Sequence, residues 1–411
     1  MILSEARKRK LSLSAIFFTY CMDSLGWAIV FPIFAPFFLN QNNHLFSSDV
    51  SLATRTTVLG FFLTAFSLGQ FLGAPLVGEY ADRHGRKKAL CLTVFFTSLG
   101  SALTAWSVQE QNLYFLFAGR LLMGLFAGNM TICLACIADL NEEESKKVKY
   151  FGYLSVIAGL SFILGAFVGG KISDHTVSSY FSPEFPLWIA TGLSLANLGF
   201  VFFGFYETQL VEKKGKFDFL ESLHNIKEAL KIKKIKSIYS IYFLFLFAWT
   251  MLFQFTPVLV VRDFAFTNSN IGDLALFMGL CWALGAGYLN KILQHWFSTL
   301  QILETCLLIF TVLCGFLIFP SHIYIVLAAV AGCVIIGGLA WPLCNGLISS
   351  TAPRESQGKI LGMSQSTQSL AMTLAPAVGG VVYQIFDGFP FLLGALASFV
   401  AGILYFSLKE R

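Results

Sequence analysis

The sequence is short of charged residues, and it therefore lacks the surface that a soluble protein needs. Asp, Glu, Lys and Arg make up 12% of its 411 residues, against about 25% in an average soluble protein. Hydrophobic residues make up 56%, 44 residues are Phe, and the mean hydropathy is +0.70. This composition excludes disordered, fibrous and nucleic-acid-binding proteins, so we expect no nucleic-acid partner. It predicts a multi-pass integral membrane protein with little mass outside the lipid bilayer.

Side chains that hold metals or perform catalysis are also scarce inside the apolar stretches. None of the six His residues lies deep in a predicted span, which argues against a buried histidine metal site or proton relay. The nine Cys residues lie within apolar stretches, and their odd number argues against a disulfide framework. A membrane enzyme or sensor is the alternative from a different class. It would need a catalytic constellation or an added soluble domain, and neither is visible. We expect no enzyme, metal or cofactor.

Twelve apolar stretches are long enough to cross a hydrocarbon core, which takes about 20 residues of helix. They predict an all-α integral membrane protein with twelve transmembrane helices, numbered here as spans 1 to 12. The spans lie near residues 11–39, 53–77, 89–108, 113–138, 151–172, 186–206, 237–261, 271–293, 298–319, 322–350, 358–386 and 388–408.

Positive charge predicts the orientation of these spans, because Lys and Arg accumulate in cytoplasmic loops. Alternate connections and the two termini carry 24 of the 28 Lys and Arg residues, whereas the opposite loops hold only Lys171 and Arg262. We therefore expect both termini in the cytoplasm. The basic segments are 7–10, 83–88, 146–149, 213–236, 291, 354–359 and 409–411.

The longest of the predicted cytoplasmic connections, 207–236, divides the chain into an N-terminal half, 1–206, and a C-terminal half, 237–411. Within it, Asp218-x-x-Glu221 resembles a helix capping box followed by apolar residues at helical spacing. We expect an amphipathic helix on the inner leaflet. A solvated charged linker is the alternative.

The two halves share short sequence matches at an offset of about 210 positions. Leu164-Gly-Ala-Phe-Val-Gly-Gly170 aligns with Leu374-Ala-Pro-Ala-Val-Gly-Gly380, and Leu72-Gly-Ala74 aligns with Leu284-Gly-Ala286. Because an even number of spans separates the matches, they predict two parallel six-helix repeats. Transporters built in this way bind substrate near the bilayer midplane between the repeats.

The loop after span 2 carries the most specific motif. It reads Gly78-x-x-x-Asp82-Arg83-x-Gly85-Arg86-Lys87-Lys88 and resembles the signature of the major facilitator superfamily at every fixed position. Gly78 permits close helix contact, Gly85 a tight turn, and the charges hold the cytoplasmic ends together. The resemblance implies a cytoplasmic latch in which Asp82 engages the start of span 11 and Arg86 pairs with Asp139 at the end of span 4.

Spans 1 and 4 resemble one group of this superfamily, the drug:proton antiporters that include the tetracycline exporters. Span 1 contains Asp23-x-x-Gly26 followed by Pro32 and Pro36, and span 4 contains Arg120-x-x-x-Gly124-x-x-x-Gly128. From the span ends we expect Asp23 and Arg120 at similar depth. Because buried charges usually pair or face a cavity, we predict that the two pair and couple transport to protons. A purely structural ion pair is the alternative.

Span 5 resembles the antiporter motif G-P-x-x-G-G less faithfully, since Ala166 stands where Pro is usual. The matching site in span 11 retains the proline. We predict helix packing for this group of residues, which comprises Gly165, Gly169, Gly170, Pro376, Gly379 and Gly380.

In this superfamily spans 1, 4, 7 and 10 line the substrate cavity. Aromatic walls with a few uncharged polar groups suit an amphipathic organic molecule better than a sugar, although each side chain could instead serve helix packing. The predicted substrate residues are Tyr20, Trp27, Met123, Asn129, Trp249, Gln254, Trp341 and Asn345, with Gln365 and Gln368 added from span 11.

The sequence thus predicts a secondary transporter that moves a small organic solute by alternating access. Outward antiport against protons is the preferred mode, and proton-coupled import of a nutrient such as an amino acid is the alternative. The expected partners are the solute, protons and the lipid bilayer. We expect a monomer in the inner (plasma) membrane of a bacterium.

Overall fold

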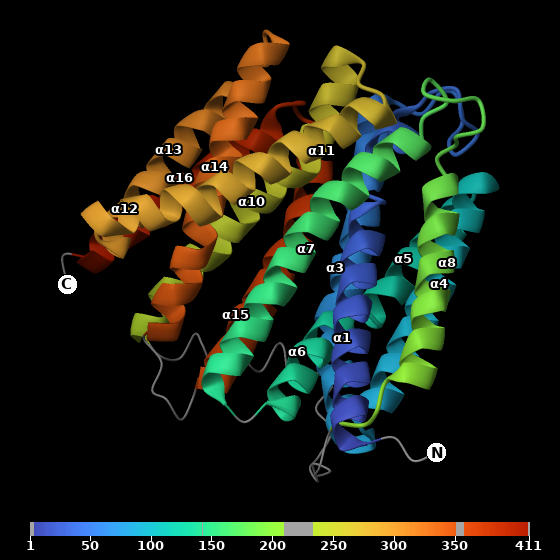
Figure 1. Cartoon of the computed structure of the whole chain (residues 1–411). Helices are drawn as coiled ribbons and strands as arrows, with labels where there is room; N and C mark the ends of the chain where they lie inside the picture. The colour runs from blue at the N-terminus through green and yellow to red at the C-terminus, as the bar shows by residue number, and fades with distance from the viewer. Residues whose placement is uncertain (1–3, 142, 209–232, 351–356, 410–411) are drawn as a thin grey trace. The chain divides into compact units, whose positions relative to one another are not determined.

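The computed structural model describes residues 4–141, 143–208, 233–350 and 357–409, and every regular element in these ranges is helical (Figure 1). The amphipathic helix predicted within 207–236 lies outside the described residues. The helices before it are α1 (Glu5–Ala28), α2 (Phe34–Leu39), α3 (Leu52–His84), α4 (Arg86–Gln109), α5 (Leu113–Leu125), α6 (Asn129–Leu140), α7 (Glu144–Ile172) and α8 (Phe185–Gly204). Those after it are α10 (Lys233–Phe264), α11 (Asn268–Ala283), η1 (Leu284–Leu289), α12 (Asn290–Trp296), α13 (Thr299–Phe316), α14 (Ile323–Ser350), α15 (Gln357–Val382) and α16 (Phe389–Lys409).

Ten helices in the described part of the chain are long and apolar enough to cross a membrane. They correspond to ten of the predicted spans. The two others are span 1, which forms α1 and α2, and span 11, which forms α15. Both are more polar, because the basic run 7–10 lies in the first turns of α1 and because Ser, Thr and Gln follow one another along the first half of α15. The number of twelve transmembrane helices therefore stays a prediction.

Three of the predicted spans are irregular near their middle. In span 1, α1 ends at Ala28 and α2 begins at Phe34, with Pro32 in the intervening turn, where its missing N–H cannot continue a helix. In span 4, α5 ends at Leu125 and α6 begins at Asn129. In span 8, the π-helical segment η1 joins α11 to α12.

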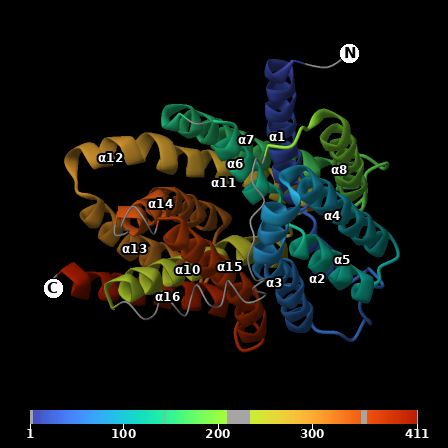
Figure 2. The same ribbon diagram turned by 90° about the horizontal axis from the view of Figure 1, so that it is seen from below.

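The first of two compact units contains the described residues of 1–34, 68–220 and 268–275. In it, α1 packs against α6, α7 and α8, and α4 packs against α5 and α8, as Figure 2 shows for α4 and α5. The core side chains come from α1, α3, α4, α6, α7 and the end of α8, among them Ile16, Val77, Leu90, Ile137, Leu154 and Phe205. Because lipid is as apolar as these side chains, close packing rather than exclusion of water holds them together.

The second unit contains the described residues of 35–67, 221–267 and 276–411. Its core forms where α10 meets α13, α14, α15 and α16, and it includes Tyr242, Phe245, Leu303, Leu307, Leu343, Ala371 and Ala401. Helices α3 and α11 contribute residues to both units, so the units differ from the predicted halves over 35–67 and 268–275. The division into halves 1–206 and 237–411 stays a prediction.

Candidate functional site

Asp23 lies near the end of α1, and its carboxylate accepts a hydrogen bond from a neighbouring helix. The side-chain nitrogen Nδ2 of Asn129 donates to Oδ1 of Asp23 at 2.8 Å. Asn129 is 1% exposed, whereas Asp23 remains partly exposed. The structure therefore brings together a predicted proton-coupling residue and a predicted substrate residue.

The break in span 4 explains how Asn129 reaches Asp23. Between α5 and α6 the chain makes a tight turn, in which Ala127 N–H donates to the Gly124 carbonyl at 3.0 Å and Gly128 N–H donates to the Phe126 carbonyl at 2.8 Å. Asn129 follows as the first residue of α6. The positive end of the α6 dipole therefore lies beside Asp23, where it favours a negative charge.

Arg120 lies elsewhere on span 4. It is 6% exposed in α5, and its guanidinium carbon is 5.3 Å from the centre of the Phe34 ring. The hydrogen bond described for Asp23 comes from Asn129, and the contact described for Arg120 is with the Phe34 ring, so the predicted pairing of Asp23 with Arg120 stays a prediction.

Helix α1 begins at Glu5, well before residue 11, so Asp23 lies farther from the start of its helix than predicted. The coupling role of Asp23 and Arg120 stays a prediction.

The other predicted substrate residues of the first unit have different surroundings. Tyr20 packs beside the core. Trp27 is 40% exposed, and its ring centre is 5.4 Å from that of Phe162 in α7. Met123 turns toward α4, where its sulfur lies 3.9 Å from the hydroxyl of Thr104. These contacts favour a packing role for Met123 and leave Tyr20 and Trp27 as candidate binding residues on the same helix as Asp23.

Tryptophans of three spans meet in the second unit. The ring centres of Trp249 and Trp282 are 4.8 Å apart, and those of Trp282 and Trp341 are 5.8 Å apart with the rings 75° to each other. Phe253 stacks on Trp249 at 6.0 Å. Trp282 belongs to span 8, which is not among the spans that line the cavity in this superfamily, so the sequence did not predict it. We call Trp249, Trp282 and Trp341 the tryptophan cluster.

The predicted polar residues of the second unit do not form one group. Asn345 lies beside the side chain of Tyr242, and Gln368 Nε2 lies 3.9 Å from the sulfur of Met372. Gln365 is exposed and Gln254 is half-buried. Their role in binding stays a prediction.

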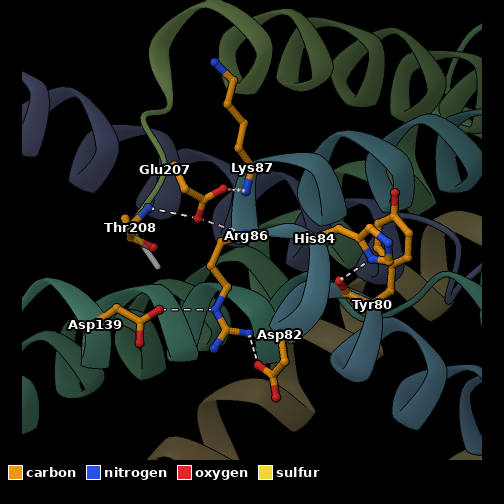
Figure 3. A network of polar contacts seen from close by, with 8 residues as sticks. All are labelled: Tyr80, Asp82, His84, Arg86, Lys87, Asp139, Glu207 and Thr208. Carbon is orange, nitrogen blue, oxygen red and sulfur yellow. Dashed lines mark hydrogen bonds and ion pairs between the residues drawn. The ribbon is translucent and has the colours of Figure 1, made fainter. Parts of the chain in front are cut away.

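Three of the predicted latch residues, Asp82, Arg86 and Asp139, meet in one charged network where α3 ends and α4 begins (Figure 3). The Arg86 guanidinium lies 2.7 Å from the Asp82 carboxylate and 3.2 Å from that of Asp139 at the end of α6. The contact between Arg86 and Asp139 is the one that the motif implies. Arg83 pairs instead with Glu79, one turn earlier in α3. Whether this network acts as a latch stays a prediction.

Glu207 completes this network and was not predicted. Its carboxylate accepts hydrogen bonds from the backbone N–H groups of Arg86, at 2.9 Å, and Lys87, at 3.1 Å (Figure 3). The first N–H groups of a helix have no partner within the helix, so Glu207, which follows α8, caps α4. The signal in the sequence is a lone acid directly after span 6, on the predicted side of the basic loops.

The two glycines of the motif differ in their surroundings. Gly85 has φ +95°, a conformation that other residues rarely adopt, and a Cβ there would collide with the Glu207 carboxylate. A Cβ built on Gly78 would meet none of the described atoms within 4 Å. The close helix contact expected at Gly78 stays a prediction.

The predicted packing glycines lie where helix backbones cross. A Cβ on Gly170 of α7 would lie 2.7 Å from the Cα of Gly272 in α11, and one on Gly380 of α15 would lie 3.1 Å from the Cα of Gly60 in α3. Offsets of 210 and 212 relate these two contacts, as the repeat predicts for equivalent positions. The remaining residues also lie in helix contacts: Gly165 faces Leu25 and Ala28, Gly169 faces Ile29, Gly379 faces Phe255 and Met251, and the Pro376 carbonyl faces Gly60.

Polar contacts reinforce the crossing of α7 and α11. Lys171 Nζ donates to Asp273 Oδ2 and to Ser269 Oγ, both at 2.8 Å. Asp174, which is 6% exposed, accepts a hydrogen bond from the backbone N–H of Ser269 at 2.9 Å in the first turn of α11. From the sequence, Lys171 was predicted only to lie in one of the outer loops, which contain few cations.

A protein-family model matches most of the chain. The family model described as "Major Facilitator Superfamily" matches residues 16–337 and 297–411. The chain belongs to the major facilitator superfamily. This confirms the resemblance drawn from the loop after span 2 and the predicted fold. It also shows that the chain is a multi-pass membrane transporter of a small molecule and not an enzyme.

Several curated relatives match nearly the whole chain. The "Tetracycline resistance protein, class H" of Pasteurella multocida is 25% identical over 382 residues, which cover 91% of this chain and 90% of the relative. The class B protein of Escherichia coli is 26% identical over 407 residues, with the same coverage. "Multidrug resistance protein 2" of Bacillus subtilis is 25% identical and covers 86% of this chain and 87% of its own. These relatives confirm the resemblance to the tetracycline-exporter group.

Solved structures show the same fold. The human organic anion transporter MFSD10 (TETRAN) has a TM-score of 0.71 at 18% identity, covering 97% of this chain and 99% of that one. A D-xylose-proton symporter has a TM-score of 0.75 at 14% identity, covering 96% and 97%. Within the described ranges, no group of three or more His, Cys, Asp or Glu side chains could hold a metal ion.

Proposed function

We propose that the chain is a proton-coupled antiporter that exports an amphipathic organic compound. The observation that carries the proposal is the carboxylate of Asp23, which accepts a hydrogen bond from Asn129 at the start of the helix that follows the break in span 4. Such discontinuous helices form ion and substrate sites in transporters. A carboxylate inside a span costs free energy and usually marks a proton or substrate path.

The tryptophan cluster and the relatives support the substrate class. Flat aromatic walls bind flat or amphipathic molecules through large apolar contacts. The printed names of the relatives refer to tetracycline and to multiple drugs, so tetracycline is the first compound to try.

The distribution of Lys and Arg supports an orientation with both termini in the cytoplasm. The bacterial relatives support a bacterial inner membrane, and we propose that the transporter acts as a monomer. With this orientation, the Arg86 network and Glu207 lie on the cytoplasmic side, and the crossing of α7 with α11 lies outside.

Transport of labelled compounds into proteoliposomes with an imposed pH gradient tests the proposal. The panel contains tetracycline, a lipophilic cationic dye and an amino acid. An antiporter accumulates a compound when the lumen is acidic, because protons leave as the compound enters, and a symporter does so when the outside is acidic. We expect tetracycline or the dye to accumulate in acidic vesicles only. Accumulation of the amino acid from an acidic exterior would establish the import alternative instead.

A further inference from the structure

The carbonyl oxygen of Asn129 lies in a position that the hydrogen bond to Asp23 does not explain. Its amide nitrogen donates to Oδ1 of Asp23 at 2.8 Å. Its own Oδ1 is buried and accepts no hydrogen bond from any described residue. A buried acceptor without a donor is costly, so the amide is only half satisfied while Asp23 is ionised.

Protonation of Asp23 would supply the missing donor. An ionised carboxylate only accepts hydrogen bonds, whereas a carboxylic acid also carries one O–H donor. The acid and the primary amide each hold two polar atoms on one carbon. The amide N–H can therefore donate to the acid carbonyl while the acid O–H donates to the amide oxygen, which closes a ring of two hydrogen bonds.

We propose that Asn129 is a positioning residue for the proton-binding carboxyl of Asp23, and that it forms a second hydrogen bond to that carboxyl only when a proton is bound. The inference rests on the proposed function and deepens it. The carboxylate takes the proton from water and returns it to water, and no other bond is made or broken. Proton uptake thereby tightens the contact of α1 with α6, and proton release loosens it.

Few other groups can compete for this proton. Among the described residues, the titratable side chains that interact electrostatically with Asp23 are Tyr20 on its own helix and Cys133 of α6. On the side of α7, the neighbouring polar group is the Ser161 hydroxyl, which lies 3.4 Å from Cys21. Helix α8 (Phe185–Gly204), which also packs on α1, contains no charged residue. Arg120 belongs to α5, nine positions before Asn129, and its guanidinium lies over the Phe34 ring.

Infrared difference spectroscopy of the purified full chain in lipid nanodiscs tests the proposal without any substrate. A pH titration reveals the carbonyl stretch of protonated carboxyl groups, and the band that disappears in Asp23→Asn belongs to Asp23. We expect Asn129→Leu to shift this band to higher wavenumber, because both hydrogen bonds to the acid are lost. Asn129→Gln keeps the amide and should move the band back toward its wild-type position.

Asn197→Leu is the matched control. Asn197 is 3% exposed in α8 and accepts a hydrogen bond from Thr19 of α1 at 2.9 Å, so its loss disturbs α1 without touching Asp23. We expect an unchanged Asp23 band in this variant. If Asn129→Leu is not recovered from membranes, Asn129→Ser, which cannot form the two-bond ring, should give a smaller shift in the same direction.

An Asp23 band at the wild-type position in both Asn129→Leu and Asn129→Ser overturns the inference, as does an equal shift in Asn197→Leu. Failure of the proposed function is a separate outcome. If the Asn129 variants shift the band as expected but Asp23→Asn still accumulates compound against a pH gradient, the inference stands and the proton-coupling role of Asp23 falls.

Discussion

The two compact units place different chemistry in their membrane-spanning helices. The first unit holds Asp23, Arg120 and Asn129 inside its spans. The second unit holds the tryptophan cluster. The repeat offset of 210 to 212 carries Asn129 to residues 339–341, which are Leu339, Ala340 and Trp341.

This difference suggests a division of labour between two units that share one architecture. A carboxyl that binds a proton needs a polar partner and a helix end, and both lie in the first unit. An amphipathic compound needs apolar and aromatic surface, which the second unit offers. Substitutions in one unit at a time test this difference, because each should change one property of transport and leave the other unchanged.

The largest expected effect comes from Asp23→Asn. Without an ionisable group at this position, compound accumulation driven by a pH gradient should fall to the background level, while exchange of labelled for unlabelled compound continues. The assay is uptake into proteoliposomes with and without the gradient. Asp49→Asn, which removes an exposed acid, is the control and should behave like wild type. Full gradient-driven uptake in Asp23→Asn would contradict the assignment of proton coupling to the first unit.

Trp282→Ala should alter substrate binding and leave coupling intact. Loss of an aromatic partner in the cluster should raise the apparent KM by roughly threefold to tenfold, with the same dependence on the pH gradient. Trp106, a 40% exposed residue of α4, provides the control variant Trp106→Ala. Equal KM values for Trp282→Ala and wild type would place the binding surface elsewhere.

Glu207→Ala should lower the stability of the protein, because it removes a helix cap in the first unit. Loss of the carboxylate leaves two N–H groups of α4 without their cap, which costs about 1 kcal/mol. We expect a lower thermal unfolding temperature in detergent. Glu207→Gln keeps an acceptor and should recover most of the loss. An unchanged unfolding temperature in Glu207→Ala would show that water replaces the cap without cost.

The smallest effect is expected at the crossing of α7 and α11. The Lys171–Asp273 ion pair is partly exposed, with side-chain exposures of 29% and 50%, and such pairs contribute about 0–1 kcal/mol. The single variant Lys171→Met should change the transport rate only slightly. Gly170→Leu should be more harmful, since its side chain would press on the backbone of Gly272. A larger loss of transport in Lys171→Met than in Gly170→Leu would show that the ion pair, and not the close backbone contact, stabilises the crossing.

Much of the fold could be predicted from the sequence because hydropathy and charge are properties of whole segments. The loop motif from Gly78 to Lys88 gave the family, and the matches at an offset of 210 anticipated equivalent contacts at Gly170 and Gly380. Helix ends were less certain. Helix α1 begins at Glu5, before the predicted start at residue 11, and hydropathy could not reveal this because the first turns of α1 are basic.

The site was predicted less well, since partners depend on local breaks and on contacts between distant segments. Asn129 was expected to bind substrate because it lies at midplane depth, but the turn between Leu125 and Asn129 directs it to Asp23. Glu207 caps a helix that begins 121 positions earlier. No periodic pattern in the sequence encodes that contact.

Proton release on substrate binding tests the central claim most directly. The purified protein in weakly buffered detergent receives the panel compound that accumulates in acidic vesicles, and a pH indicator records the protons released. The account predicts release that saturates with the compound in wild type and in Trp282→Ala, at higher compound concentrations in the latter, and none in Asp23→Asn. Equal proton release from wild type and Asp23→Asn would contradict it.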